Sequence, residues 1–256
     1  MQLTIGFLYP NLLNLYGDYG NVECLVRRCQ WRGIEVSVQE ISPGEDLPWQ
    51  EIDLLLAGGG PDLAQKLVAE DLVTKKTAGL KNYLEAEKVG LFICGSYQLL
   101  GHYYRPWQGP DLPGVGILDL YTQHFGLTRK RCVGNVVVRL NPQLLTEIKS
   151  FYSASCLETL VGFENHGGRT YLGKDLLPLG KITKGSGNNG EDYLEGVHFR
   201  NFLGTYLHGP LLPKNPHLAD WLIGKALFLK YSQSVSLLPL NDDLAWAAHR
   251  QALALK

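Results

Sequence analysis

The chain has 256 residues, of which 45% are hydrophobic and 19% are charged, and its formal net charge at pH 7 is −1. A chain of this size can bury a sizeable core, as one large domain or as two closely joined ones. The near-neutral charge balance gives no electrostatic reason to expect nucleic acid or an anionic membrane as the partner. No apolar run approaches the roughly 18 residues of a membrane-spanning helix, and the N-terminus lacks the basic region of a signal peptide. Together with five cysteines, an odd number, these features predict a cytoplasmic protein without membrane insertion.

Strand-like and helix-like segments alternate over residues 1 to about 105. Short apolar runs predict the strands, and apolar residues at helical spacing predict the helices between them. This alternation predicts an α/β fold, with a doubly wound, mostly parallel sheet flanked by helices and a site at the C-terminal ends of the strands. The predicted strands are 3–9, 35–41, 54–57 and 90–93, and the predicted helices are 21–32, 62–69 and 75–87.

The second half of the chain has short strand-like runs separated by glycine and asparagine turns, which predicts a mixed or antiparallel extension of the sheet. Residues 185–190 predict a tight, flexible hairpin connection, because Asn-Gly favours turns with positive φ. Two amphipathic helices are predicted next, and the alanine-rich apolar face of the second is suited to packing on the core or on another chain. We therefore expect a single domain over 1–256 with a C-terminal helical extension from about 216. The predicted strands are 131–140, 160–165, 179–184, 195–199 and 202–206.

Cys94 stands directly between the apolar strand 90–93 and a helix-like segment. Gly95 and Ser96 are small enough for a sharp turn that keeps the thiol exposed at the end of a sheet, and a helix N-terminus favours the thiolate. The alternative is a buried packing thiol. The remaining cysteines have neither Cys-x-x-Cys pairing nor zinc-ligand spacing, so we expect them to be packing residues and expect no metal site. They are Cys24, Cys29, Cys132 and Cys156.

A thiolate that attacks a carbonyl needs donors for the oxyanion and an imidazole that moves the proton. The candidate donors are the backbone N–H of Gly95 and that of Gly59 or Gly60, although the triple glycine at 58–60 is equally consistent with a tight turn. His208 ends a strand-like run and is the favoured base. His166 is the runner-up, with a structural role as its alternative.

Two segments carry a family resemblance. Residues 93–101, Ile-Cys-Gly-Ser-Tyr-Gln-Leu-Leu-Gly, resemble the nucleophile elbow of the class I, Cys-dependent glutamine amidotransferases, and residues 204–209, Gly-Thr-Tyr-Leu-His-Gly, resemble the histidine motif of their cobyric-acid-synthase-like branch. The resemblance implies that Gln98 helps to hold the substrate and that Arg131 grips the α-carboxylate of glutamine in bidentate fashion. A solvated basic run at 129–131 is the alternative for Arg131.

Within this branch, further segments resemble the glutaminase subunits of lipid II isoglutaminyl synthase. This resemblance implies that the chain hydrolyses L-glutamine and passes ammonia to a MurT-like subunit of the Mur ligase family. That partner would use ATP to convert D-glutamate of lipid II to D-isoglutamine in peptidoglycan synthesis. The chain has no Walker loop, so we expect no cofactor in this subunit and ATP on the partner. The alternatives are an amidotransferase of another pathway, such as the cobalamin pathway, and a catalytically silent binding protein on the same fold. The segments that carry this second resemblance are 12–16, 18–21, 162–170, 187–189 and 209–215.

The chain departs from the family pattern at two positions. Many class I enzymes have a glutamate two residues after the catalytic histidine, but Pro210 occupies that position here. The site is then a Cys94–His208 dyad, or an acid from elsewhere completes a triad. We hypothesise that the partner subunit supplies this acid, which would keep activity low until ammonia has an acceptor, and Glu164 is the internal candidate. The second departure is Ser96, where glycine is common, and serine should still fit the turn.

Overall fold

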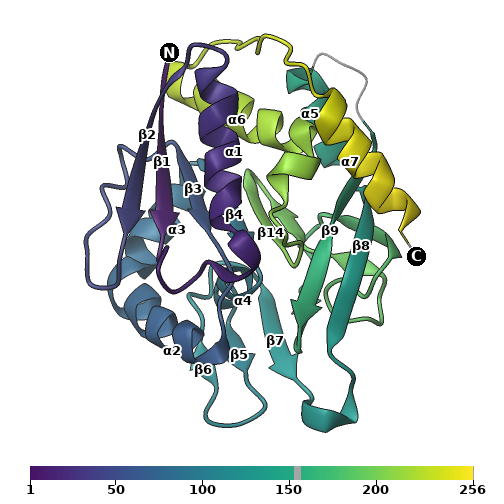
Figure 1. The fold of residues 1–256 in the computed structure, drawn as a ribbon. Helices are drawn as coiled ribbons and strands as arrows, with labels where there is room; N and C mark the ends of the chain where they lie inside the picture. Colours follow the sequence, from purple (N-terminus) through teal and green to yellow (C-terminus); the bar gives the residue numbers. More distant parts are fainter. Residues whose placement is uncertain (153–156, 256) are drawn as a thin grey trace.

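The structure is a computed structural model that describes residues 1–152 and 157–255. Cys156, one of the expected packing cysteines, lies outside the described residues. Within them, the strands form one six-stranded sheet and two four-stranded sheets, and helices cover the larger sheet (Figure 1). The α/β fold class predicted from the sequence is confirmed.

The six-stranded sheet has the spatial order β13–β14–β4–β3–β1–β2. All neighbouring strands pair in parallel except β13 and β14, which form an antiparallel hairpin at one edge. The four strands predicted in the first half of the chain are all present in it. In chain order the strands are β1 (Gln2–Leu8), β2 (Glu35–Ile41), β3 (Leu54–Ala57), β4 (Val89–Ile93), β13 (Val197–Phe199) and β14 (Phe202–Thr205).

The connections of this sheet run in two directions from its centre. Helix α1 (Tyr19–Gln30) leads from β1 outward to β2, whereas α2 (Asp62–Asp71), the π-helical turn η2 (Leu72–Lys76) and α3 (Thr77–Glu85) lead from β3 outward to β4. Right-handed crossovers in opposite directions place α1 and the α2–α3 pair on opposite faces of the sheet. The winding direction changes between β1 and β3, and ligands of such sheets bind at the C-terminal strand ends beside that point.

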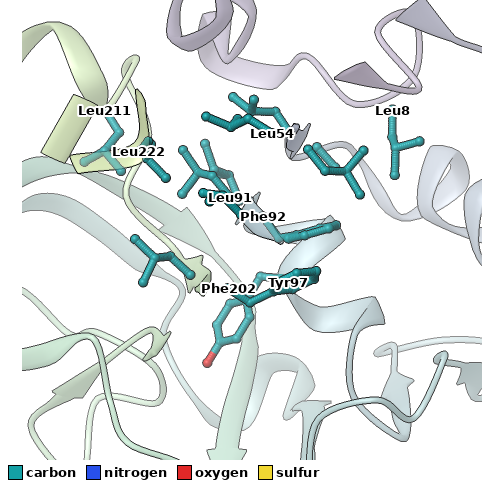
Figure 2. Close-up of a cluster of buried hydrophobic side chains, with 14 of the residues drawn as sticks. Leu8, Leu54, Leu91, Phe92, Tyr97, Phe202, Leu211 and Leu222 are labelled. Atoms are coloured by element: carbon teal, nitrogen blue, oxygen red, sulfur yellow. The ribbon is translucent and has the colours of Figure 1, made fainter. Parts of the chain in front are cut away.

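The core lies on both faces of this sheet. Its side chains are almost fully buried, and they come from the central strands, from α4 (Gly95–Leu99) and from α6 (Pro216–Tyr231) and the segment that precedes it. Figure 2 shows a cluster of these buried side chains, among them Leu8, Leu54, Leu91, Phe92, Tyr97, Phe202, Leu211 and Leu222.

The other two sheets correct part of the prediction for the second half. A single extension of the first sheet was expected, but only β13 and β14 extend it. The second sheet, of order β10–β7–β5–β6, and the third, of order β12–β11–β8–β9, are separate. The strands of these two sheets are β5 (Tyr103–Arg105), β6 (Leu112–Pro113), β7 (Leu120–His124), β8 (Cys132–Leu140), β9 (Thr159–His166), β10 (Gly168–Leu172), β11 (Gly180–Lys184) and β12 (Leu194–Glu195).

Gly196 divides the predicted strand 195–199 between two sheets. Its φ is +61°, and a Cβ at this position would lie 2.3 Å from the carbonyl oxygen of Gly204, so only glycine fits. The chain turns here from β12 in the third sheet to β13 in the first. The pairing of strand segments, which periodicity does not encode, decided the number of sheets.

The 185–190 connection joins the antiparallel strands β11 and β12, as predicted, but it is not a flexible loop. Gly187, Asn188 and Asn189 are buried. The carboxylate of Glu164 accepts hydrogen bonds from the N–H groups of Ser186 at 2.7 Å and Gly187 at 2.9 Å. The amide side chain of Asn188 bonds both the N–H and the carbonyl oxygen of Gly196. These bonds replace the solvation that a mobile turn would have.

Helix α6 differs from the amphipathic helix predicted after Pro213. Its first nine residues, 216–224, are all buried, because it packs on β1, β3 and β4 as well as on α1 and on α5 (Pro142–Phe151). Helix α7 (Asp243–Ala254) lies along β9 and the short 3₁₀ turn η4 (Leu212–Lys214), beside the third sheet in Figure 1. The described residues contain no helix whose length and apolar character would suit a membrane crossing.

Candidate active site

Cys94 lies at the C-terminal end of β4, in the sharp turn that the sequence predicts. Its backbone has φ 52° and ψ −107°, a conformation that side chains other than glycine rarely adopt. Ser96 stabilises the turn, since its hydroxyl accepts a hydrogen bond from the N–H of Ile93 at 2.9 Å and lies 2.8 Å from the carbonyl oxygen of Ala57. The serine that departs from the family pattern therefore holds the elbow. The short helix α4 begins directly after it.

His208 and Cys94 meet on either side of Gly59. A Cβ at residue 59 would lie 2.7 Å from Cε1 of His208 and 2.9 Å from Cβ of Cys94. The adjacent glycines leave room for the backbone that follows β1. A Cβ at Gly58 would lie 2.3 Å from the carbonyl oxygen of Leu13, and a Cβ at Gly60 would lie 2.6 Å from that of Leu12. None of the three glycines has a positive φ. Close approach, and not turn geometry, therefore accounts for the triple glycine.

Asp18 supplies the acid that was expected from the partner subunit or from Glu164. Its Oδ1 lies 3.1 Å from Nδ1 of His208, and both side chains are almost completely buried. The prediction that Glu164 is the internal acid was wrong, because its carboxylate is bound to the backbone N–H groups of residues 186 and 187. Since the position beside Nδ1 is filled from within the chain, orientation of the imidazole does not require an acid from a partner. Cys94, His208 and Asp18 have the arrangement of a nucleophile, a base and an orienting acid.

The segment that carries Asp18 also fixes the loop after His208. Gly20 leaves room for Pro210, whose Cγ would lie 2.6 Å from a Cβ at that position. The side-chain oxygen of Asn21 accepts a hydrogen bond from the N–H of Leu212 at 2.8 Å. The start of α1 therefore holds His208 and the loop after it at three points.

The surroundings of His208 favour its protonated form. Burial lowers the pKa of the imidazole, but the hydrogen bond to Asp18 and the interaction with Cys94 outweigh it and raise the pKa to about 10. Nδ1–H donates to Asp18, so Nε2 is the nitrogen available to the thiol. An imidazolium beside Cys94 stabilises a thiolate, which is the nucleophilic form of cysteine.

A pocket of about 260 Å³ opens next to Cys94. It brings together Cys94, Gln98, Arg131 and Gly60 from the sequence prediction, whereas His208, Gly59 and Gly95 do not line it. Segments from all three sheets contribute. The lining residues are Leu15, Gly60, Pro61, Asp62, Gln65, Cys94, Gln98, Tyr104, His124, Arg131, Asn165, His166, Gly167 and Gly168.

Arg131 is exposed and reaches the pocket from the loop before β8. Asn165 holds one edge of its guanidinium: the side-chain oxygen accepts from Nε, and the backbone oxygen accepts from Nη2 at 3.1 Å. The edge formed by Nη1 and Nη2 remains for a carboxylate, in the bidentate geometry that arginine favours. The arginine is thus oriented rather than part of a freely solvated basic run.

Gln98 lines the same pocket and is buried. Its Nε2 donates to the hydroxyl of Tyr206 at 2.9 Å, and its Oε1 has no hydrogen-bond partner among the described residues. A buried, unpaired amide oxygen is costly unless a ligand supplies a donor. This oxygen suits an ammonium or amide N–H of a bound substrate.

The three predicted oxyanion donors differ in their geometry. The N–H of Gly59 donates to Oδ2 of Asp18 at 2.8 Å, so it is already used and the prediction for this group was wrong. Gly60 lines the pocket. Gly95 is the first residue of α4, where backbone N–H groups have no partner within the helix. Gly60 and Gly95 stay as predicted donors.

His166, the runner-up base, is a wall of the pocket. Its ring stacks on that of Tyr206 with centroids 3.7 Å apart, and its Nδ1 donates to the carbonyl oxygen of Gly168 at 2.7 Å. Its stacking on Tyr206 and its bond to the Gly168 carbonyl suit a structural role better than proton transfer at Cys94. In the part of the chain that the structure describes, no three His, Cys, Asp or Glu side chains gather as a metal site would require.

Comparison with known proteins identifies the relatives of this arrangement. Residues 4–216 match the CobB/CobQ-like glutamine amidotransferase domain. The chain belongs to this family. Within it, the chain is 43% identical to the GatD subunit of lipid II isoglutaminyl synthase (glutamine-hydrolyzing) from Staphylococcus aureus, over 88% of this chain and 84% of that one. It is 39% identical to the GatD subunit from Streptococcus pneumoniae, over 95% of this chain and 87% of that one.

A solved glutamine amidotransferase from Thermotoga maritima has the same fold, with a TM-score of 0.56 at 15% identity over 98% of this chain and 93% of that one. The GatD relatives extend the kinship beyond fold, because they match over most of their own length. Membership of the GatD family confirms the subfamily resemblance drawn from the sequence motifs. The match to the family domain ends at residue 216, at the start of α6.

Proposed function

We propose that this chain is the glutamine-hydrolysing subunit of a lipid II isoglutaminyl synthase. The observation that carries the proposal is the meeting of Cys94, His208 and Asp18 beside a pocket that also contains Arg131 and Gln98. A pocket of about 260 Å³ has the size for an amino acid and not for a large acceptor. Similarity to the GatD subunits supports lipid II amidation as the pathway, and the arrangement of the site residues supports glutamine hydrolysis as the reaction.

The first half of the reaction breaks the side-chain amide of glutamine. The Cys94 thiolate attacks the amide carbon, and the N–H groups of Gly60 and Gly95 stabilise the oxyanion. His208 donates its proton to the leaving nitrogen, so that ammonia departs and a glutamyl thioester remains. Arg131 holds the α-carboxylate during this step, and Gln98 accepts a hydrogen bond from the substrate.

The second half restores the enzyme. His208, now neutral, takes a proton from water as the water oxygen attacks the thioester carbon. Collapse of the tetrahedral intermediate releases glutamate and returns the thiolate with its imidazolium. Asp18 stabilises that imidazolium and keeps the proton on Nδ1, so that Nε2 faces the reacting groups in both halves.

Ammonia is passed to a partner subunit, for which we propose a MurT-like protein of the Mur ligase family, working with this chain in the cytoplasm. That partner holds ATP and amidates D-glutamate of lipid II to D-isoglutamine, while the present subunit needs no cofactor. Two apolar side chains near the pocket support a docked partner there. Leu63 follows the pocket residue Asp62 and is 76% exposed, and Leu127, in the loop before Arg131, is 87% exposed.

The test is ammonia release from L-glutamine by the purified chain, alone and with the partner. Because Asp18 completes the triad within the chain, we expect slow release by the subunit alone and faster release in the complex. Cys94→Ala should abolish both activities, while the control Cys24→Ala should retain them. No release that depends on Cys94 in either state would contradict the proposal.

A further inference from the structure

Tyr16 has a strained backbone at the edge of the active site. It lies in the turn η1 (Leu15–Gly17), between β1 and α1, with φ 58° and ψ 22°. A residue with a Cβ adopts this left-handed conformation at a cost, and it persists where the surroundings hold the residue in place. The side chain is 40% exposed, so burial does not hold it. The contacts of its ring and of its hydroxyl group hold it in place.

The ring of Tyr16 packs against the catalytic imidazole. Its centroid lies 5.1 Å from that of His208 with an interplanar angle of 70°, an arrangement that aromatic pairs prefer. Asp18, two residues further on in the same segment, binds Nδ1 of the same imidazole. One short segment therefore fixes His208 twice, through a hydrogen bond and through ring packing.

The hydroxyl of Tyr16 contacts a residue that lines the pocket. It accepts a hydrogen bond from Nδ2 of Asn165, and the oxygen atoms of Asn165 hold Nε and Nη2 of Arg131. Asn165 and Arg131 both line the pocket, together with Cys94. Continuous contacts thus join the group proposed to bind the glutamine carboxylate to the group proposed to move the proton.

We propose that Tyr16 is a positioning residue with two separable effects: its ring holds His208 in line with Cys94, and its hydroxyl holds Asn165, and thereby Arg131, in place for the substrate. Tyr16 itself does not touch the reacting atoms. The inference rests on the proposed glutaminase function and adds a residue that neither the nucleophile motif nor the histidine motif contains.

Two substitutions separate the two effects. Tyr16→Phe keeps the ring and removes the hydroxyl, so KM for glutamine should rise by roughly tenfold, the equivalent of one hydrogen bond in a charged site, with kcat within twofold. Tyr16→Asn tolerates the left-handed backbone and removes the ring, so kcat should fall by at least about tenfold as His208 loses alignment. Steady-state kinetics of ammonia release measure both constants.

Tyr193 provides a matched control. It is also a tyrosine with a left-handed backbone, φ 59°, it is 71% exposed, and it does not line the pocket. Tyr193→Phe and Tyr193→Asn should leave kcat and KM unchanged. Thermal melting of all four variants identifies any loss of fold. Equal effects of Tyr16→Phe on kcat and KM, or an unchanged kcat in folded Tyr16→Asn, would overturn the proposal.

A second readout does not depend on the identity of the substrate. Iodoacetamide alkylation of Cys94 reports how well the imidazole stabilises the thiolate. Tyr16→Asn should slow this alkylation several-fold, while Tyr16→Phe and both Tyr193 variants should leave it unchanged. If the chain does not hydrolyse glutamine, the proposed function fails while the alkylation result still decides the role of the ring. An alkylation rate unchanged by Tyr16→Asn contradicts the positioning role even in an active glutaminase.

Discussion

The two ends of helix α1 carry buried charges that serve different purposes. At its start, Asp18 forms one buried contact with His208, whose second nitrogen is left for Cys94. Near its end, Arg28 makes two-pronged contacts with Asp220 of α6 and with Asp242 before α7. The imidazole of His208 keeps one nitrogen without a partner among the described residues, whereas every nitrogen of the Arg28 guanidinium is hydrogen-bonded. A buried charge can thus be arranged for chemistry or for cohesion, and a nitrogen left without a partner distinguishes the first case from the second.

The largest effect on activity is expected from Asp18→Asn. The asparagine keeps the volume but removes the charge that holds His208 as an imidazolium and fixes its tautomer. We expect kcat/KM for glutamine hydrolysis at pH 7 to fall by about 10²–10⁴-fold, while the variant still unfolds in one cooperative transition. Ammonia release and calorimetry measure these quantities. Retention of most activity would show that the imidazole is oriented from elsewhere.

At the other end of the helix, Arg28→Met should act on stability. The substitution leaves the buried carboxylate of Asp242 without a counter-charge and leaves Asp220 with Arg32 alone, which costs about 3–5 kcal/mol in the free energy of unfolding. Urea denaturation measures this loss, and the exposed neighbour Arg27→Met should change stability by no more than about 0.5 kcal/mol. The activity of the folded fraction should be preserved. A variant that stays stable would mean that the closed cluster contributes no cohesion.

Gly59→Ala tests how tightly the reactive end is packed. The added methyl group would meet Cys94 and His208 at less than 3 Å, so the pair must separate. We expect at least a tenfold fall in kcat, since a displacement of about 1 Å in a catalytic group can cost 10²-fold. Steady-state kinetics at saturating glutamine provide the measurement. Wild-type kcat in this variant would contradict the close approach that we assign to the glycine.

The smallest expected effect is a difference in the pH dependence of stability. The pKa of His208 is raised to about 10 in the folded protein, from about 6.5 for an ordinary histidine. Its charged form therefore stabilises the fold fully below about pH 6.5, and this contribution is lost as the pH rises through about 10. Asp18→Asn should show a shallower decline in unfolding free energy over this window. Urea titrations at several pH values test this, and parallel curves for the two proteins would contradict the assignment.

The sequence predicted most of the site, but not its acid. Cys94 and His208 could be placed because each follows an apolar run that had to be a strand of a parallel sheet. Asp18 lies 190 residues from His208 in the chain, within a short turn without periodicity, so nothing local reveals the contact. The motif 18–21 was recognised as part of a resemblance, and a search for acids at the ends of predicted strands and helices could have singled it out.

The fold shows the same division between local and distant information. Strand positions followed from apolar runs, whereas the separation into three sheets depended on Gly196 and on which edges pair. The connection 185–190 was predicted as flexible because its composition is that of a solvated turn. Its rigidity comes from Glu164 and from its own Asn188, whose partners are set by tertiary structure. Composition indicates the flexibility of a segment in isolation, and it does not reveal the tertiary hydrogen bonds that make the segment rigid.

The position of β14 has a consequence for the order of events during synthesis. His208 is delivered by β14, the last strand to join the first sheet, whereas the thiol and the acid belong to the first hundred residues. A chain that is still emerging from the ribosome can fold β1 to β4 and yet has no base beside its cysteine. The nascent protein is therefore silent as a hydrolase until synthesis has passed His208.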